Sequence, residues 1–78
     1  MEKRLSQMTP QESGTVVRVE AEGQIKRRLY DMGVTAGASV RYIKTAPLGD
    51  PLQVVLRGYS LSLRKTEAQN VFVEVAGL

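Results

Sequence analysis

Apolar and polar residues alternate along much of this 78-residue chain, a pattern that predicts short β-strands with one buried face. In the segment 15–22 (TVVRVEAE), Val17, Val19 and Ala21 share one face, and charged residues occupy the other. We therefore expect a half-buried strand here, with these three side chains directed into a core.

Four further segments have the composition of strands. They are predicted at 39–46, 52–58, 59–63 and 71–75. Gly58 separates the middle two, which are therefore expected to be arms of a bent strand or hairpin. Residues 1–4 are expected to be a frayed end, and the segment 8–14 (MTPQESG) is predicted to be a turn.

The period changes after Gly23. Ile25, Leu29 and Met32 recur at i, i+4 and i+7, which predicts an amphipathic helix of two to three turns with these residues facing the core. Gly33 follows at once and is expected to end the helix in the left-handed conformation. A second, single helical turn is predicted over 64–70.

The same helix turns Lys26, Arg27 and Tyr30 outward, because each residue rotates the chain by about 100°. Arg28 lies at the edge of the apolar stripe, where its stem can follow the core and its guanidinium can pair with a carboxylate. Charged residues on such a face are most often simply solvated. An exposed Tyr beside Arg, however, is typical of protein interfaces.

The segment 47–51 (PLGDP) is predicted to be the sharpest loop of the chain, because two prolines, a glycine and an aspartate fall within it. Asp50 is expected to form its own turn there. Asp31 is expected to pair with Arg27, four residues before it on the helix.

Several short strands at close spacing with one substantial helix favour a small β-barrel over an open sheet. The predicted fold is mainly β: a small Src-homology-3-like (SH3-like) barrel with one inserted α-helix and a short C-terminal helical turn. It is predicted to form a single domain over residues 1–78. Closure of the barrel is expected to leave no exposed sheet edge.

The composition argues against an enzyme. The sequence contains no His and no Cys, so it lacks the usual catalytic nucleophile–base pairs and the usual zinc ligands. Glu20 and Glu22 share a strand face but are expected to be solvated, and no phosphate-binding loop with a lysine is present. We therefore predict no catalytic residue, no metal site and no cofactor.

The charge pattern gives little support to nucleic-acid binding. Eleven Lys or Arg and eight acidic residues give a net charge of +3, and no block of like charge stands out. Tyr42 and Tyr59 are expected to be partly buried, which leaves few aromatic side chains for base stacking. With no signal peptide and no long apolar run, the chain is expected to be cytoplasmic.

Two blocks of the sequence resemble a known family. RRLYDMGVTAGASV (27–40) is similar to the Arg-Leu-x-x-Met-Gly-x-x-x-Gly signature of the FeoA family. APLGDPLQVVLRGYSLSLRKTEAQNVFV (46–73) resembles its second block, in which a Pro-Leu-Gly-Asp-Pro loop precedes a strand and later a Glu-Ala pair. The resemblance extends over roughly residues 5–76.

The resemblance implies an SH3-like accessory protein of bacterial ferrous iron uptake. Its implied partner is FeoB, a membrane transporter with a cytosolic G-protein domain, through which alone the chain would be associated with the membrane. An effect on GTP turnover, by an arginine supplied in trans, is a narrower version of this hypothesis. The sequence selects no arginine for it and does not indicate whether the chain self-associates.

Most residues of the two blocks have structural explanations as core residues, helix ends, turns or anchors. The motif residues interpreted as structural are Arg28, Leu29, Met32, Gly33, Gly37, Pro47, Pro51, Leu63, Arg64, Glu67 and Ala68. Among them, Leu63 and Ala68 are expected to pack the last helical turn onto the barrel. Arg28 and Arg64 are expected to anchor loops by hydrogen bonds.

Two surfaces are candidates for contact with the partner. One is the outward side of the helix, and the other is the tip of the loop. Their residues are Lys26, Arg27, Tyr30, Leu48, Gly49 and Asp50. There are two alternative functions. One is a nucleic-acid-binding barrel, and the other is a metal-sensing domain, because the same fold module also resembles the C-terminal domain of DtxR-type repressors.

Overall fold

The computed structural model describes residues 1–76, so the last two residues of the predicted 1–78 domain lie outside the described part. Six strands, two α-helices and one 3-10 helix follow one another along that part. They are β1 (Glu2–Arg4), η1 (Leu5–Gln7), β2 (Ser13–Val19), α1 (Gly23–Asp31), β3 (Ser39–Thr45), β4 (Leu52–Leu56), β5 (Tyr59–Leu63), α2 (Lys65–Ala68) and β6 (Val71–Val75).

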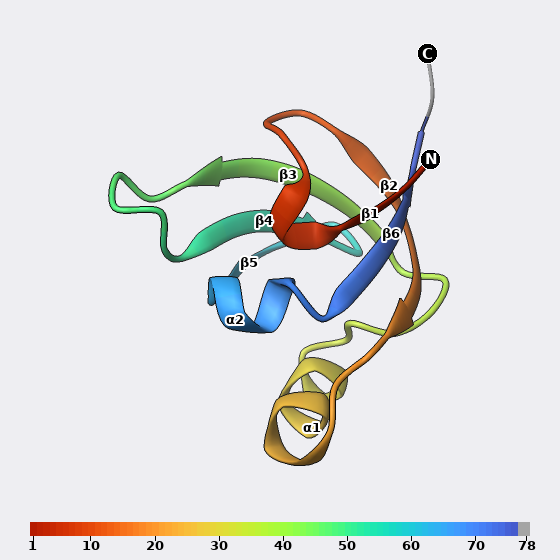
Figure 1. Ribbon diagram of the computed structural model, residues 1–78. Coiled ribbons are helices and arrows are strands. Elements are labelled where there is room, and N and C mark those ends of the chain that lie inside the picture. The colour runs from red at the N-terminus through yellow and green to blue at the C-terminus, as the bar shows by residue number, and fades with distance from the viewer. Residues whose placement is uncertain (77–78) are drawn as a thin grey trace.

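The strands form one antiparallel sheet in the order β1-β6-β2-β3-β4-β5. The sheet curls around the core, and α1 and α2 lie below it in the view of Figure 1. The predicted mainly β, SH3-like architecture with one inserted helix and a short second helix is confirmed. Complete closure is not: β1 and β5 are the two ends of the strand order, and among residues 1–76 no pairing joins them.

The N-terminus is ordered, so the expectation of a frayed end at residues 1–4 is wrong. β1 pairs with β6 in antiparallel register, with Lys3 opposite Val73. The Lys3 ammonium lies 3.0 Å from a carboxylate oxygen of Glu12, and Glu2 accepts two hydrogen bonds of 2.9 Å from Arg18. These contacts join residues distant in sequence, which is why a local pattern does not reveal them.

The buried face of β2 differs from the prediction. Val16 is fully buried, whereas Val17 is 37% exposed. A register shift lies between Val16 and Arg18 in the pairing of β2 with β6, and such a bulge exchanges the faces of the residues beyond it. Val19 and Ala21, after the shift, are half-buried and pack against the core as expected.

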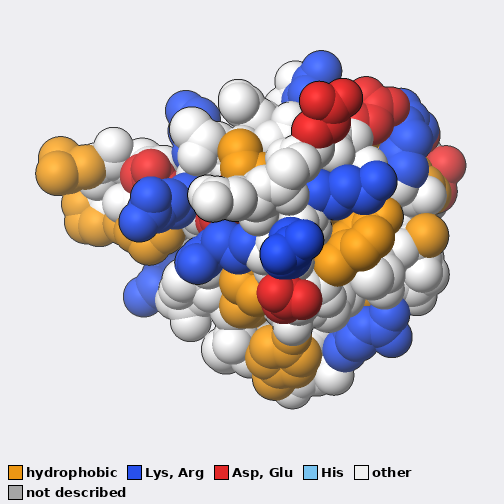
Figure 2. All heavy atoms as spheres, turned by 90° about the horizontal axis from the view of Figure 1, so that it is seen from below, with side chains coloured by type: hydrophobic (Ala, Val, Ile, Leu, Met, Phe, Trp, Pro, Cys, Tyr) orange, Lys and Arg blue, Asp and Glu red, His pale blue; other side chains and the backbone are white. Residues whose placement is uncertain are grey.

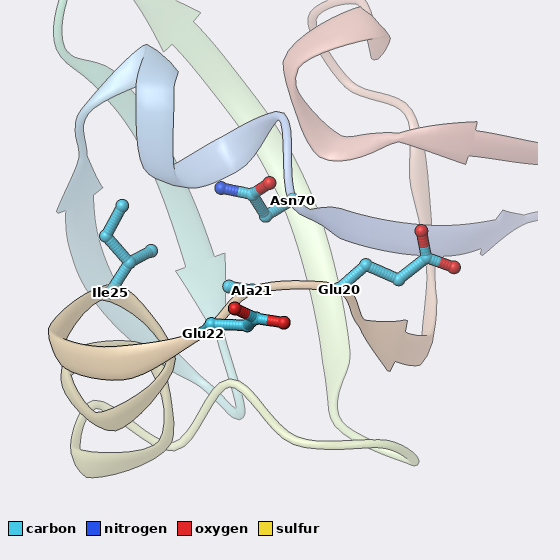
Figure 3. Close-up of a pocket in the computed structure, with 5 residues that line it drawn as sticks. All are labelled: Glu20, Ala21, Glu22, Ile25 and Asn70. Carbon is cyan, nitrogen blue, oxygen red and sulfur yellow. The ribbon is translucent and has the colours of Figure 1, made fainter.

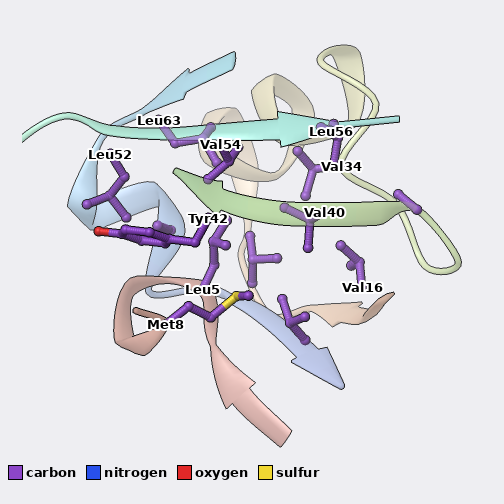
Figure 4. Packing of buried hydrophobic residues seen from close by; sticks show 14 of the residues in the cluster. Leu5, Met8, Val16, Val34, Val40, Tyr42, Leu52, Val54, Leu56 and Leu63 are labelled. Atoms are coloured by element: carbon purple, nitrogen blue, oxygen red, sulfur yellow. The ribbon is translucent and has the colours of Figure 1, made fainter. Parts of the chain in front are cut away.

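The core lies inside the curl of the sheet and is closed on one side by η1 (Figure 4). Its largest fully buried side chains are Leu5, Leu29, Leu52, Leu56, Leu63, Val16, Val34, Val54, Val71 and Val73. Burial alternates along β4, with Leu52, Val54 and Leu56 directed into the core. Gly14 of β2 pairs with Val75 of β6, and a Cβ at Gly14 would meet the backbone carbonyl oxygen of Glu74.

β4 and β5 form a hairpin around Gly58, one of the two arrangements that the sequence predicts. Its two turn residues, Arg57 and Gly58, have φ of +49° and +89°, the conformation typical of a two-residue hairpin turn. Tyr59 is more exposed than predicted, at 45%. Its hydroxyl donates to the backbone carbonyl of Met32, which ties the start of β5 to the end of α1.

Candidate functional site

The C-terminal half of α1 holds the helix on the barrel. Leu29 is fully buried and Met32 packs against the core. Gly33 ends the helix with φ of +89°, a conformation that side chains rarely adopt, and the Val34 N–H reaches back to the Leu29 carbonyl at 2.9 Å. Gly37 forms the following turn with φ of +93° and donates its N–H to Val16.

An ion pair joins α1 to α2. The Arg28 Nε lies 2.6 Å from Oε2 of Glu67, whose side chain is only 6% exposed. The other carboxylate oxygen, Oε1, accepts the backbone N–H of Arg64 at 2.9 Å, at the first turn of α2. Both oxygens of a buried carboxylate are therefore satisfied, one by each helix, as burial of a charge requires. The Arg64 contact thus uses its backbone and not its guanidinium.

Ile25 does not join the core, although the helical stripe predicts that it does. It is 39% exposed and borders a shallow hollow of about 510 Å³ shared with Glu20, Ala21, Glu22 and Asn70. Figure 3 shows its side chain rising from α1 into the space between the two helices. Because only Leu29 of this helix is fully buried, the first turn stands away from the barrel.

The outward side of α1 carries the predicted contact residues. Lys26 and Arg27 are exposed, and Tyr30 is 47% exposed. The Lys26 ammonium lies 5.7 Å from the centre of the Tyr30 ring, one helical turn away. A shallow hollow of about 470 Å³ runs between these side chains, Gly23 and Asp31. The three predicted residues therefore form one continuous surface, here called the α1 surface.

The expected ion pair between Asp31 and Arg27 is not formed. Among residues 1–76, Arg27 is in none of the ion pairs. Its guanidinium is therefore available for contact with another molecule.

The predicted loop between β3 and β4 is tightly shaped. The Gly49 N–H bonds to the Ala46 carbonyl at 2.8 Å, and Gly49 has φ of +91°. Asp50 does not form its own turn as predicted: its Oδ1 accepts the backbone N–H of Lys65 at 2.9 Å, at the start of α2. Leu48 is 98% exposed. Gly49 and Asp50 thus have structural explanations, and Leu48 is the contact candidate that remains on the loop.

The two candidate surfaces are separate. Figure 1 places the β3–β4 loop at one side of the sheet and α1 below it. The underside of the molecule, seen in Figure 2, has Lys and Arg side chains gathered around its centre among apolar ones.

Carboxylates do not converge into a cation site in the part of the chain that the structure describes, where no group of three candidate ligands is found. Glu20 accepts a hydrogen bond of 2.5 Å from Nε of Arg18. The hydrogen bonds that Arg18 donates to Glu2, and then to Glu20, raise the pKa of its guanidinium above the ordinary value.

The sequence gives no sign of one cluster on the outer face of β1, β2 and β6. Phe72 lies between two guanidinium groups, 4.8 Å from Arg4 and 4.2 Å from Arg18, measured to the ring centre. Arg4 also donates to the Gln69 carbonyl at 2.6 Å. Because these residues come from three strands, only the sheet order reveals their contact. The contacts of Arg4 and Arg18 with Phe72 help to hold β1 against the rest of the sheet.

Comparison with known proteins decides the family. Residues 3–75 match the FeoA domain. The chain belongs to the FeoA family. The resemblance of its two sequence blocks is thereby confirmed, and the family links it to iron transport.

A curated relative joins this domain to a transporter. The chain is 33% identical over 72 residues to the Fe(2+) transport protein A/Fe(2+) transporter FeoB fusion protein of Porphyromonas gingivalis. The alignment covers 92% of this chain and 8% of the fusion protein.

Solved structures of the family share the fold. A FeoA-like protein from Clostridium acetobutylicum has a TM-score of 0.90 at 36% identity, covering 99% of this chain and 90% of that one. Stenotrophomonas maltophilia FeoA complexed with zinc, described as a procaryotic SH3 domain protein, has a TM-score of 0.77 at 33% identity, covering 95% and 89%. A manganese-dependent transcriptional repressor, 21% identical with a TM-score of 0.88 over 96% of this chain and 37% of its own, shares the fold alone.

Proposed function

We propose that this FeoA-family chain is a small cytoplasmic accessory protein of ferrous iron uptake, which regulates a FeoB-type transporter by binding its cytosolic part. In this proposal the chain performs no chemical step and carries no cofactor.

The observation that carries the proposal is the fusion protein of P. gingivalis, which joins a FeoA module and a FeoB transporter in one chain. Covalent linkage keeps two modules at high effective concentration, so that even a weak contact between them is occupied. A separate chain of the same family would then make the corresponding contact between molecules.

The α1 surface is the proposed contact. It combines an exposed Tyr with two cations, Lys26 and Arg27, on a helix that the buried Leu29 and the Arg28–Glu67 pair hold in place. Tyr and Arg are enriched where proteins meet, and a helix fixed in advance loses little conformational freedom on binding. Leu48 on the β3–β4 loop is a second, separate contact candidate.

No helix within residues 1–76 has the length and apolar character needed to cross a membrane. In the proposal, the transporter brings the chain to the membrane surface. The G domain is the expected contact within the transporter, because it is the part in which a regulator could sense or alter the nucleotide state.

The test is a binding titration of the purified chain and its variants against detergent-solubilised FeoB from the same organism. Arg27→Glu combined with Tyr30→Ala removes the exposed cation and the ring, and both residues are exposed enough to leave the fold intact. We expect affinity to fall by about tenfold or more, as for the central residues of an interface.

The matched control is Lys44→Glu, an equal change of charge at an exposed residue of β3. It should bind like the unmodified chain. Equal affinity of the double variant and the control would show that the α1 surface is not the contact, even if binding itself is observed.

A further inference from the structure

The outer edge of β5 has backbone groups without a partner strand. β5 is the last strand of the sheet, and it pairs with β4 over five residue pairs from Leu56↔Tyr59 to Leu52↔Leu63. In antiparallel ladders, hydrogen-bonded and non-hydrogen-bonded pairs alternate. A two-residue turn closes on a hydrogen-bonded pair, here Leu56 and Tyr59. The N–H and C=O groups of Ser60 and Ser62 therefore point away from β4.

These outward groups are free in the described structure. Neither Ser60 nor Ser62 takes part in the backbone hydrogen bonds that residues 1–76 make outside their regular elements. Both residues are exposed, and Figure 4 shows β5 at the end of the sheet, beyond β4. The edge offers two donors and two acceptors at the spacing of a strand.

The β5 edge lacks the features with which proteins protect sheet edges. Charged residues, prolines and bulges usually prevent pairing with another chain. The opposite edge strand, β1, has the sequence Glu-Lys-Arg. β5 has the sequence YSLSL, without charge or proline, and its pairing with β4 shows no register shift. This edge is therefore suited to accept an added strand.

Cations flank the edge at both ends. Arg57 lies in the turn before β5, and Arg64 and Lys65 follow it directly. No acidic residue occurs from position 51 to position 66. Two carboxylates also lie at the far end: Asp50 accepts the Lys65 N–H, and Glu67, which is paired with Arg28, accepts the Arg64 N–H. At the near end, the Arg57 guanidinium donates to the Gly33 carbonyl and to the Thr35 hydroxyl, both neutral. The net charge at each end is therefore positive, and acidic residues flanking an uncharged centre would be complementary to it.

We propose that the β5 edge binds an extended acidic peptide segment as an additional strand of the sheet. Backbone hydrogen bonds to Ser60 and Ser62 supply the attachment, and Arg57, Arg64 and Lys65 select acidic flanks. This surface is distinct from the α1 surface, and the proposal does not rest on the contact with FeoB.

A second copy of this chain fits the edge less well. If two β5 strands paired antiparallel with Ser60 of one opposite Ser62 of the other, the turn that contains Arg57 would come near the start of α2 that contains Lys65, at both ends of the interface. Like charges brought together across an interface oppose association. The charges that favour an acidic peptide therefore disfavour self-pairing.

The test uses the whole chain and a terminally blocked peptide, Asp-Glu-Val-Thr-Val-Glu-Asp, followed by backbone amide NMR. Ser62→Pro removes an outward N–H and places a ring at the edge; proline is tolerated at this position of an edge strand. Ser62→Thr keeps the N–H and serves as the control. A peptide with Lys in place of every acidic residue tests the charge selection.

We expect the acidic peptide to shift the amide signals of Ser60 and Ser62 and to slow their hydrogen exchange. Ser62→Pro should weaken binding by at least about tenfold, whereas Ser62→Thr should bind normally. Equal binding of the Lys peptide would overturn the charge assignment. Absence of binding, or binding that leaves the Ser60 and Ser62 amides of the unmodified chain unchanged, would overturn the site whether or not Ser62→Pro folds. A dimer that Ser62→Pro abolishes would show that the occupant is a second copy.

Discussion

The ion pair between the two helices gives a sharp prediction about stability. Glu67→Ala removes both contacts of a carboxylate that is only 6% exposed. Loss of the bond to the Arg64 N–H costs about 1 kcal/mol, as for other helix caps. Loss of the bond to Arg28 costs about 1.5 kcal/mol, at the low end for a charged hydrogen bond, because the Arg28 side chain is 58% exposed and partly screened by water. The variant should therefore be less stable by about 2–3 kcal/mol.

Arg28→Ala should destabilise the chain by about 1–2 kcal/mol, because it leaves Glu67 buried with one partner fewer. When Arg28→Ala and Glu67→Ala are combined, the loss of stability should be smaller than the sum of the two single losses by about 1 kcal/mol, since each single change already breaks the bond between the two side chains. Lys65→Ala, on the same helix but exposed, is the control and should change stability by less than about 0.5 kcal/mol.

Urea unfolding followed by circular dichroism measures these values, with thermal unfolding as a second assay. For a domain of this size each kcal/mol shifts Tm by about 4–8 °C, so Glu67→Ala should lower Tm by about 10–20 °C. Additivity of the two changes within about 0.3 kcal/mol would refute the reasoning, because it would mean that Arg28 and Glu67 do not stabilise each other.

Three further predictions concern the fold. Leu29→Ala should lower the free energy of unfolding in urea by about 2–5 kcal/mol because Leu29 is fully buried, whereas Ile25→Ala should lower it by less than about 1 kcal/mol. Equal losses of stability in the two variants would contradict the placement of α1. Gly14→Ala should lower the free energy of unfolding by about 1–3 kcal/mol, since its Cβ would lie 2.8 Å from Cγ1 of Val73 and closer still to the backbone oxygen of Glu74. A thermal melt like that of the unmodified chain would show that β2 and β6 are farther apart at this point than the structure places them. Hydrogen bonds from the Thr9 N–H, and then from Lys3, hold the pKa of the Glu12 carboxyl below its ordinary value. The ionised Glu12 therefore stabilises the fold above the unfolded-state pKa of about 4.3, and this stabilisation is lost as the pH falls through the lower folded-state pKa. Glu12→Gln should remove this part of the acid sensitivity in urea unfolding at stepped pH, and a pH profile unchanged by the substitution would contradict the assignment.

Local patterns predict five of the six strands found in residues 1–76, the main helix and its end, because alternation, helical period and left-handed glycines act over a few residues. The β4–β5 hairpin and the inward face of β4 follow from such signals. The bulge in β2 does not, since it depends on how Val16 and Arg18 meet β6. Local patterns do not predict the strand β1 for the same reason: its partners, β6 and Glu12, lie elsewhere in the chain.

The candidate site was predictable only in part. Helical geometry places Lys26, Arg27 and Tyr30 on one exposed surface, as the sequence indicates. Ile25 was misplaced because periodicity gives the side of a helix but not the number of its turns that reach the barrel. Asp50 looked like a turn residue, and only the fold brings it to the start of α2. That the partner binds at the α1 surface stays a prediction.

The most direct test of the proposed function is titration of the purified chain against detergent-solubilised FeoB of the same organism, with GDP, with a GTP analogue and without nucleotide. The account predicts saturable binding, at an affinity that depends on the nucleotide if the G domain makes the contact. Absence of binding in every nucleotide state would contradict the accessory role, and the link to FeoB would then be limited to the fusion protein.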